Sequence, residues 1–450
     1  MKKLPAAKED SLFLPRLFAA VFGAFLGLSL LKFGNPPIME KWTLAPKEIF
    51  EFLFNSTWPS SWAYLLLALV AVIGILCSRH KPGCPLWLPA LLLLWYLWQC
   101  LAASASIDPA LSAPTLSHFT ACVVCFALGL FCLGRLKDPS PFWIGLICGF
   151  AIVLFAGFEQ HFGGLKETRR YFFLYLYQDV KDLPPGYLTK ITSDRIFATL
   201  FYPNALAGAL LLLLPPSLAV MLKTGRLTLP ARFFVASVWT LASLACLFWS
   251  GSKGGWLLML LLGLLAMARL SISLRIKASV IGIILVLGLA AFFVRHAGYF
   301  GKGATSVSAR FDYWRAALEI TGRHPAVGTG PGTFFIPYSK IKKPESEPSR
   351  LTHNDYLEQA SDSGVPGFLF YSAFMVAALI WSYPGKGADW LRYAAWLGVL
   401  GFCLQGLMEF SLYLPNLAWP AFAMLGWLMA EPRFPAKAKA EASAKPNLPG

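Results

Sequence analysis

The run Trp62-Ala-Tyr-Leu-Leu-Leu-Ala-Leu-Val-Ala-Val-Ile-Gly-Ile-Leu-Cys77 decides the fold class, because none of its sixteen residues is charged. Similar runs recur along the chain, and of its 450 residues 57% are hydrophobic and only 14% are charged. A helix of about 20 mostly apolar residues crosses the hydrocarbon core of a bilayer. We therefore expect an all-α polytopic membrane protein with about 12 transmembrane helices.

Twelve apolar stretches can be drawn as spans. The stretch 42–53 is left out because it is short and carries Lys47, Glu48 and Glu51. The first span has no small-x-small cleavage site after its apolar core and is followed by more spans, so we do not interpret it as a cleaved signal peptide. The expected spans are Leu12–Leu31, Trp62–Cys77, Leu86–Ala103, Thr115–Leu133, Pro141–Phe158, Ile196–Leu222, Phe233–Trp249, Gly255–Ala268, Ala278–Val294, Val365–Tyr383, Leu391–Met408 and Leu412–Ala430.

Lysine and arginine residues indicate the orientation, since short cytoplasmic segments are rich in them. If the N-terminus lies inside and the spans alternate, 20 of the 39 basic residues fall in short inner segments. Two long segments, about 159–195 and 295–364, then lie outside the membrane, and the second is expected to be partly helical. We predict a single membrane domain over residues 1–430. The Ala-, Lys- and Pro-rich segment 431–450 is predicted to be a disordered cytoplasmic tail.

The formal net charge of +16 arises partly from this topology signal and partly from a modest cationic excess in the two outer segments. No nucleic acid is expected as a partner on that side of a membrane. All nine cysteines lie outside the two long segments, and the Cys122-x-x-Cys125 pair lies in an apolar helix, which favours packing over metal binding. The six histidines are scattered and form no His-Glu-x-x-His motif, so we predict no metal.

The segment 295–364 is the expected site of function, because loops held on a rigid scaffold commonly carry it. Residues 308–320 have the spacing of a short amphipathic helix with Phe311, Trp314 and Leu318 on one face. Ser308 suits its N-cap and Gly322 its end. A helix that lies on the membrane surface is the alternative interpretation.

A glycine-rich run follows, His324-Pro-Ala-Val-Gly-Thr-Gly-Pro-Gly332, with glycines at alternate positions. Glycine lets the backbone turn tightly or approach a ligand closely. The spacing and context match neither the dinucleotide fingerprint nor a P-loop. A plain turn cluster and an anion cradle both remain open.

The stretch Thr352-His-Asn-Asp-Tyr-Leu-Glu358 predicts the start of a helix. Thr352 or Asn354 can cap it, acidic residues suit its first turn, and Gly364 suits its C-terminal cap. His353 would then lie at the helix N-terminus, where the dipole disfavours the imidazolium. A neutral imidazole is what a general base requires; a capping or surface histidine is the alternative.

The sixth expected span begins near Arg195, which could bind an anion or simply extend its head to the interface. Pro203 should kink that helix or release backbone groups. Asn204 should pack against a neighbouring helix through a hydrogen bond. Lys253 is the only charge in the next tight outer turn, Ser250-Gly-Ser-Lys-Gly-Gly255.

Four of these stretches, in this order, resemble the O-antigen ligase family, which also includes O-antigen and exopolysaccharide polymerases. The first reads Arg195-Ile-Phe-Ala-Thr-Leu-Phe-Tyr-Pro-Asn204, and the second reads Ser252-Lys-Gly254. The third is Arg310-x-x-x-Trp314, which runs into His324-Pro-x-x-Gly-x-Gly-x-Gly-x-Phe334. The fourth is His353-Asn-x-x-Leu357, which is followed by Gly364-x-Pro-Gly367. The resemblance covers about residues 195–430. Lys253 departs from the pattern, since an arginine is usual there, and lysine lacks the bidentate fork for phosphate.

The resemblance implies a glycosyltransferase of the bacterial inner membrane that works on its periplasmic side. The donor would be a glycan on undecaprenyl diphosphate, and the acceptor a sugar hydroxyl of lipid A–core or the end of another glycan. No metal or nucleotide cofactor would be needed. His353 would act as the base or orient the acceptor, while Arg195, Arg310 and Lys253 would bind the diphosphate. Asn354 would orient the His353 ring or the sugar, and Tyr356 would stack on a sugar face.

Three functions stay open at this point: a ligase, a polymerase of the same family, and a solute transporter. The ligase and the polymerase share the residues above. A transporter would favour ionisable residues or broken helices near the middle of the bilayer. Apart from the prolines and Asn204 of the sixth span, the spans show few such features, which favours an enzyme.

Overall fold

The computed structural model describes residues 10–54, 57–77, 83–171, 173, 192–200, 202–301, 305–344, 346–385 and 388–430. Within these ranges the secondary structure is helical, apart from one isolated bridge between Phe33 and Thr57. Residues 174–191 of the first outer segment and the expected tail 431–450 lie outside the described residues, so what we expect of them remains a prediction.

Nine helices in the described part of the chain are long and apolar enough to cross a membrane. This confirms the all-α polytopic class. Three further helices, of 17, 16 and 15 residues, coincide with the other expected spans. The nine are α1 (Asp10–Lys32), α3 (Ser60–Cys77), α4 (Trp87–Ser104), α5 (Pro109–Ala127), α6 (Ser140–Glu159), α9 (Pro203–Lys223), α10 (Leu229–Ser250), α12 (Leu274–Gly301) and α15 (Asp355–Ser382), and the three are α11 (Lys253–Arg269), α16 (Trp390–Gln405) and α17 (Pro415–Met429).

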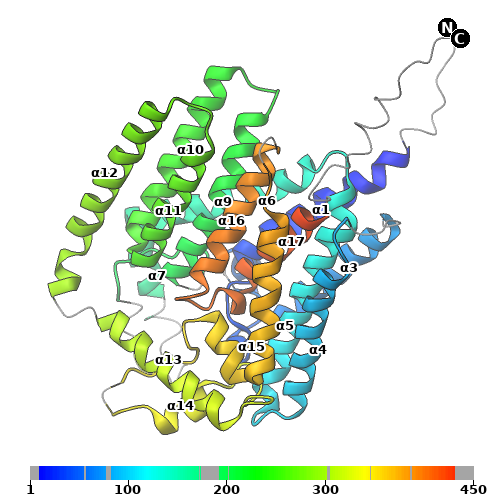
Figure 1. Ribbon diagram of the computed structural model, residues 1–450, viewed down its shortest axis with the longest axis vertical. Coiled ribbons are helices and arrows are strands. Elements are labelled where there is room, and N and C mark those ends of the chain that lie inside the picture. Colours follow the sequence, from blue (N-terminus) through cyan, green and yellow to red (C-terminus); the bar gives the residue numbers. More distant parts are fainter. Residues whose placement is uncertain are drawn as a thin grey trace, which may run out of the picture.

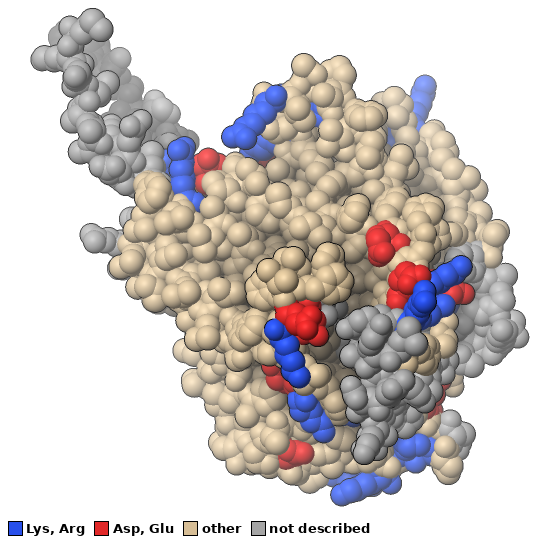
Figure 2. Space-filling view, turned by 180° about the vertical axis from the view of Figure 1, so that it is seen from behind, with Lys and Arg blue, Asp and Glu red and all other residues tan. Residues whose placement is uncertain are grey.

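The helices stand side by side, with α12 at one edge of the bundle and α3 and α4 at the other (Figure 1). Two helices outside the expected spans, α13 (Thr305–Arg323) and the short α14 (Phe335–Ile341), lie at the lower end of this view. The reverse face is largely uncharged, with Lys and Arg side chains at the upper edge of the view and again in its lower half (Figure 2). Such a surface suits a bilayer flanked by water on both sides.

Contacts between loops agree with the alternation of inner and outer segments. At one end, Lys223 pairs with Asp389 at 2.6 Å, and Arg269 donates to the carbonyl of Pro384 at 2.8 Å. All four residues belong to or border segments expected inside. At the other end, the backbone N–H of Ile107 donates to the carbonyl of Thr329, which joins two segments expected outside.

Helices α1 and α6 cross at a contact made by glycine. A Cβ on Gly23 would lie 2.1 Å from the carbonyl oxygen of Phe142, and one on Gly149 would lie 2.4 Å from the Cα of Gly27. Gly23 and Gly27, like Gly145 and Gly149, are four residues apart and share a helix face. Small residues at this spacing let membrane helices approach closely enough for their backbones to touch.

Helix α17 forms the centre of the bundle. Every one of its residues is buried, including Trp419, which packs against Phe25 of α1 and His118 of α5. The His118 imidazole accepts from the Trp419 indole N–H through Nδ1 at 3.1 Å and contacts the Leu412 carbonyl through Nε2 at 2.7 Å. Because α17 is buried on all sides, it can hold the surrounding helices in fixed positions, as a functional site built from several helices requires.

Two local predictions were wrong. The sixth span begins at Pro203 and not at Ile196, because proline lacks the N–H that a helix interior requires and suits the first helical position. Helix α13 begins at Thr305, before the expected cap Ser308, and buries Ala316, Ala317 and Ile320.

The outward side of α13 carries Phe311 and Leu318, which are 60% and 59% exposed. Two residues of the expected apolar face therefore point away from the protein, whereas the third, Trp314, is half-buried and packs against the cluster that contains Ala316 and Tyr338. Small alanines pack against α14 and α15 instead, since they let the helices approach closely.

We predict that cysteines placed at the two ends of the bundle differ in their accessibility to a reagent added from outside the cell. Lys340→Cys lies at the α13–α14 end and Thr228→Cys at the α9–α10 connection, and both positions are exposed. In a variant without other cysteines, a membrane-impermeant thiol reagent should label Lys340→Cys in cells permeabilised only at the outer membrane, and should not label Thr228→Cys. Labelling of Thr228→Cys alone would reverse the orientation.

Candidate active site

A single buried carboxylate joins four segments of the chain at the end of the bundle where α13 lies. Glu409, in the connection between α16 and α17, is only 4% exposed. Its Oε1 accepts from Asn204 Nδ2 at 2.6 Å and from Nη2 of Arg310. Its Oε2 accepts from Tyr202 Oη at 2.7 Å and lies 3.1 Å from His353 Nδ1. Three of the motifs found in the sequence thus meet at one residue.

Arg195 reaches this network through Asn204. Its Nη2 donates to Asn204 Oδ1 at 2.8 Å, and its Nε donates to the carbonyl of Ser250 at 2.6 Å. We expected Asn204 to bond to a neighbouring helix; its side chain bonds instead to Arg195 in the segment before α9 and to Glu409 in the connection between α16 and α17. Asn204 connects a guanidinium on one side with the Glu409 carboxylate on the other.

The non-helical segment before α9 is held by Gln160. The amide oxygen of Gln160 accepts from the backbone N–H of Ala198 at 2.7 Å, and its Nε2 donates to the carbonyl of the same residue at 2.8 Å. Ala198 has a φ of +53°, which a residue with a Cβ rarely adopts. These hydrogen bonds satisfy backbone groups that no helix satisfies and fix Arg195 at the start of the segment.

Arg310 extends from α13 across the end of the bundle. Its Nε donates to the carbonyl of Met408 at 2.9 Å and its Nη1 to the carbonyl of Ser306 at 3.0 Å, while Nη2 pairs with Glu409. A guanidinium has five N–H groups, so these bonds leave further donors on Nη1 and Nη2. The side chain is 19% exposed, which keeps part of it accessible to a ligand.

His353 is held in an uncommon backbone conformation beside Glu409. Its φ is +53°, and non-glycine residues in this region cluster at functional sites. The imidazole stacks on Tyr313 at 5.7 Å and meets Phe410 edge-on at 4.9 Å. Because an ionised carboxylate only accepts, Nδ1 must carry a proton to bond to Glu409, and Nε2 of the neutral ring is then the acceptor.

Electrostatics favour an ionised Glu409. Burial alone would raise its pKa, but the hydrogen bond and charge of His353 and the charge of Arg310 together lower the pKa to about 2. Burial and the neighbouring Glu409 raise the pKa of Tyr202, so its phenol stays a hydrogen-bond donor. The site therefore combines a fixed negative charge with cationic and neutral donors around it.

The remaining predicted residues lie close to this network in different roles. Asn354 is the N-cap of α15, since its Oδ1 accepts from the N–H groups of Tyr356 and Leu357 at 3.0 Å, and its Nδ2 donates to the Leu407 carbonyl. Tyr356 donates to the carbonyl of Cys403 at 3.2 Å and so points into the bundle. Lys253 is the first residue of α11, next to the turn that Arg195 contacts.

The first two turns of α15 hold the loops around His353. The Glu358 carboxylate accepts from the N–H of Thr352, directly before His353. The Asp362 carboxylate accepts from the N–H of Gly332 at 2.6 Å and from Tyr413 Oη at 3.0 Å. Gly364 has a φ of +72° and breaks the helix without ending it, so the expected C-terminal cap is a kink.

The glycine-rich run is a buried turn. Gly328, Gly330 and Gly332 all have positive φ, and a Cβ on Gly328 would lie 2.4 Å from the backbone of Asp362. The N–H of Gly330 donates to the Asp362 carbonyl at 2.8 Å. These N–H groups are used inside the protein, which favours the turn interpretation over the anion cradle.

Neither Glu409 nor Tyr202 is among the site residues that the motifs predict. Glu409 stands between two expected spans in the three-residue gap Glu409-Phe-Ser411, and a lone acidic residue between apolar helices is a signal of function. Tyr202 directly precedes the Pro-Asn pair. The contacts of Glu409 join it to residues between 56 and 207 positions away, which no local pattern reveals. Within the described ranges, no group of three or more His, Cys, Asp or Glu side chains could hold a metal ion.

Fold and site together define a multi-pass all-α membrane protein with a charge-paired polar site at one end of its helices. Residues 237–372 match the family model described as O-antigen ligase. This stretch of the chain is therefore similar to the O-antigen ligase family, which confirms the resemblance seen in the motifs. The match includes Lys253, Arg310 and His353, while Arg195 and Glu409 lie outside it. No curated protein matches the chain.

Glu409→Gln should destabilise the protein at neutral pH, because the amide keeps the size of the side chain but loses the charge that pairs with Arg310 and accepts the hydrogen bond of His353. A carboxyl with a pKa near 2 in the folded state and 4.5 ordinarily contributes roughly 3 kcal/mol above pH 4.5, a contribution lost as the pH falls toward 2. Thermal unfolding of the purified protein in detergent at pH 7 and at pH 3.5 measures both effects.

Glu319→Gln is the matched control, since Glu319 pairs with Arg323 on the exposed side of α13 and such pairs contribute less than about 1 kcal/mol. Equal unfolding temperatures for Glu409→Gln and wild type at pH 7 would refute the assignment of Glu409 as a buried anion.

Proposed function

We propose that the protein is a membrane glycosyltransferase of the ligase type. It transfers a glycan from undecaprenyl diphosphate to a sugar hydroxyl of lipid A–core at the periplasmic face of a bacterial inner membrane. It needs no metal and no nucleotide cofactor. The family match supports glycan transfer, and the excess of basic residues in the short inner segments supports the orientation.

The observation that carries the proposal is that a histidine and an arginine both contact Glu409, and that a second arginine reaches it through one intervening residue. His353 and Arg310 contact the carboxylate directly, and Arg195 contacts it through Asn204. A transferase of this kind needs a proton acceptor next to cations that hold a diphosphate. The network provides both within one hydrogen-bonded unit.

The transfer exchanges one bond for another. The acceptor hydroxyl oxygen bonds to the anomeric carbon of the donor sugar, while the bond from that carbon to the diphosphate oxygen breaks and leaves its electron pair on the diphosphate. His353 Nε2 takes the hydroxyl proton during the attack. Proton transfer by a positioned base contributes about 10²–10⁴-fold, and the Glu409 carboxylate stabilises the imidazolium that forms.

The cations act on the leaving group. Arg310 and Arg195 bind the diphosphate and stabilise the charge that grows on it as the bond breaks. Lys253 adds a point charge beside the turn that Arg195 contacts. We assign Asn354 and Tyr356 to positioning, because the side chain of each is bonded to the connection or helix around Cys403–Leu407.

A polymerase would use the same residues with the end of another glycan as acceptor. A transporter fits the site less well, because the charged groups gather at one end of the bundle and Glu409 is tied to four partners. Ionisable groups that move a solute would instead line a path near the middle of the bilayer.

Cells that lack the protein should reveal which acceptor it uses. A ligase leaves full-length carrier-linked glycan unattached, so this species should accumulate in a lipid extract. Accumulation of single carrier-linked repeat units would identify a polymerase instead. An unchanged profile of sugar lipids would count against glycan transfer altogether.

Substitution of His353 should distinguish a general base from a residue that only caps the helix. Asn354 already caps α15, so His353→Asn and His353→Ser should fold yet lose about 10²–10⁴-fold in turnover with donor binding preserved.

Arg310→Lys should lose most of its activity through weaker donor binding and slower transfer, because the lysine ammonium lacks the planar fork of N–H groups that makes three separate contacts in Arg310. Steady-state rates in a purified transfer assay measure both.

His324→Asn and Arg323→Lys are the matched controls, since both side chains are exposed on the same outer segment. They should keep wild-type rates. A fully active His353→Asn variant would remove the general base from the mechanism, although a hydrogen bond that orients the acceptor would remain compatible with it.

A further inference from the structure

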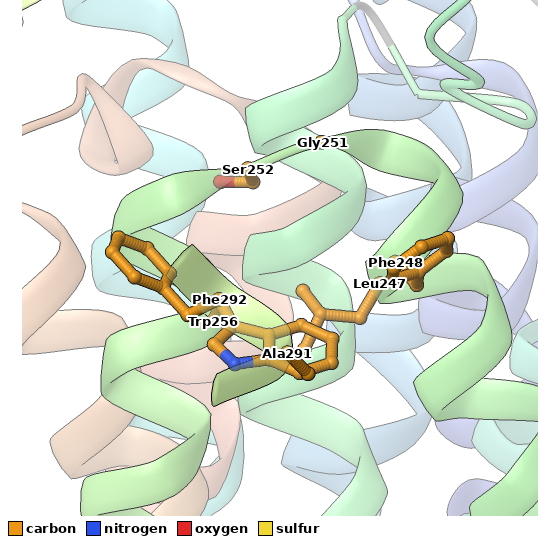
Figure 3. Close-up of a pocket in the computed structure, with 7 residues that line it drawn as sticks. All are labelled: Leu247, Phe248, Gly251, Ser252, Trp256, Ala291 and Phe292. Carbon is orange, nitrogen blue, oxygen red and sulfur yellow. The ribbon is translucent and has the colours of Figure 1, made fainter. Parts of the chain in front are cut away.

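The loop between α1 and α3 carries a short helix whose apolar side chains are exposed. For comparison, the apolar side chains beneath the α10–α11 turn pack against one another and leave no room for a ligand (Figure 3). Helix α2 (Ile49–Phe54) differs, since Ile49, Phe50, Leu53 and Phe54 are between 60% and 80% exposed. An exposed apolar cluster of this kind marks a surface of interaction.

The exposed side chains share one side of α2. Positions 49, 50, 53 and 54 recur with the spacing of a single helix face, and the rings of Phe50 and Phe54 lie 4.6 Å apart. On the other side of the helix, the ring of Phe52 packs on Trp58 at 4.5 Å. Water is an unfavourable surrounding for this arrangement, because it leaves the larger apolar surface of the helix in contact with solvent.

Both ends of α2 are held by hydrogen bonds. Lys32, the last residue of α1, donates through Nζ to the carbonyls of Phe52 and Leu53 at 3.2 and 2.7 Å. The Glu51 carboxylate accepts from the backbone N–H of Lys47 at 2.7 Å. A helix of six residues is not stable by itself in water, so these contacts help to form it. They also satisfy backbone groups that would be unfavourable to place next to lipid without a partner.

The neighbours of α2 indicate its depth. Lys32 ends the first candidate span, and Trp62 lies in the first turn of the second. The rings of Phe52 and Trp62 are 6.4 Å apart, so α2 lies level with these two span ends. One turn further along α3, Leu65 and Leu69 are 67% and 63% exposed, as expected of side chains that face lipid. Helix α2 therefore adjoins the lipid-facing surface of the bundle, at the depth where tryptophan is enriched.

The same loop contacts the segment before His353. The Arg350 guanidinium lies over the Trp42 indole at 4.6 Å and over the ring of Phe335 at 5.2 Å. Such contacts between a cation and an aromatic ring are attractive. The loop that carries α2 is thus attached to the segment that carries the candidate site, and both lie at the same end of the bundle.

We propose that α2 is an interfacial helix, which lies in the outer leaflet with the acyl chains of phospholipids around Ile49, Phe50, Leu53 and Phe54. Lys47 and Glu48, which precede the helix and are exposed, then lie among the headgroups. An amphipathic helix in this position buries its apolar face at the boundary between headgroups and acyl chains. The inference goes beyond glycan transfer and does not depend on it. Its consequence is that the loops around the candidate site are anchored at the membrane surface.

Spin labels at single cysteines test the surroundings of α2 directly. In a variant without the native cysteines, Phe50→Cys and Phe54→Cys carry a nitroxide, and the protein is placed in nanodiscs of phosphatidylcholine and phosphatidylglycerol, one copy per disc. Both labels should collide with oxygen, which concentrates among acyl chains, more often than with the water-soluble nickel complex NiEDDA. Leu69→Cys is the control for lipid and Lys340→Cys the control for water, since both positions are exposed.

The nickel collision rate at positions 50 and 54 should be several-fold below that at position 340 and close to that at position 69. Nickel collisions as frequent as at position 340 would overturn the proposal. Rare collisions with both reagents would show that protein covers α2, which would overturn it as well. Since the readout is not activity, failure of the proposed function would leave this result unchanged.

Photolabelling of the wild-type protein keeps the proposal testable if the cysteine variants do not fold. In the same nanodiscs, phosphatidylcholine with a diazirine in its acyl chain should, on irradiation, label residues 49–54 together with Leu65 and Leu69 of α3. Labelling of α3 without residues 49–54 would refute the interfacial position of α2.

Discussion

The structure depends on the neutralisation of one buried carboxylate. A charge removed from water destabilises a protein by several kcal/mol unless it is paired and hydrogen-bonded. Glu409 meets this requirement through its contacts with Tyr202, Asn204, Arg310 and His353. Its partners come from the segment before α9, from α13 and from the loop before α15, so the condition that stabilises the anion also brings these distant segments together. The contacts that assemble the site therefore also stabilise this end of the bundle.

Irregular backbone near the membrane needs the same kind of compensation. The segment before α9 is not helical, and Gln160 bonds to both backbone groups of Ala198 in place of a helix. The loop before α15 is held likewise by Glu358 and Asn354. In both places an amide or carboxylate holds the backbone at or next to a residue with positive φ; that residue is Ala198, three residues after Arg195, in the first place and His353 in the second. Side chains that appear to serve only backbone hydrogen bonding thus determine where Arg195 and His353 point.

Helix positions could be predicted from the sequence because the bilayer imposes a length and a composition that twelve stretches satisfy. The face that a helix buries could not, as α13 illustrates: Phe311 and Leu318 are more hydrophobic than Ala316 and Ala317, yet close packing against α14 and α15 selects the alanines. Motifs revealed His353, Arg195 and Arg310, whose residue types suit acid–base and phosphate chemistry. They could not reveal Glu409, since its importance lies in partners that only the folded chain brings near.

The complete burial of α17 has a consequence for how the protein is made. Chains emerge from the ribosome N-terminus first, so α1, α5 and α9 enter the membrane well before the helix they surround. Until α17 follows, the early helices expose to lipid or to one another the surfaces that later enclose Trp419 and its neighbours. The Glu409 carboxylate also arrives after all of its partners. Biosynthesis therefore delivers the surrounding helices before the central one, so the surfaces that α17 covers stay without their native contacts until the last span has been inserted.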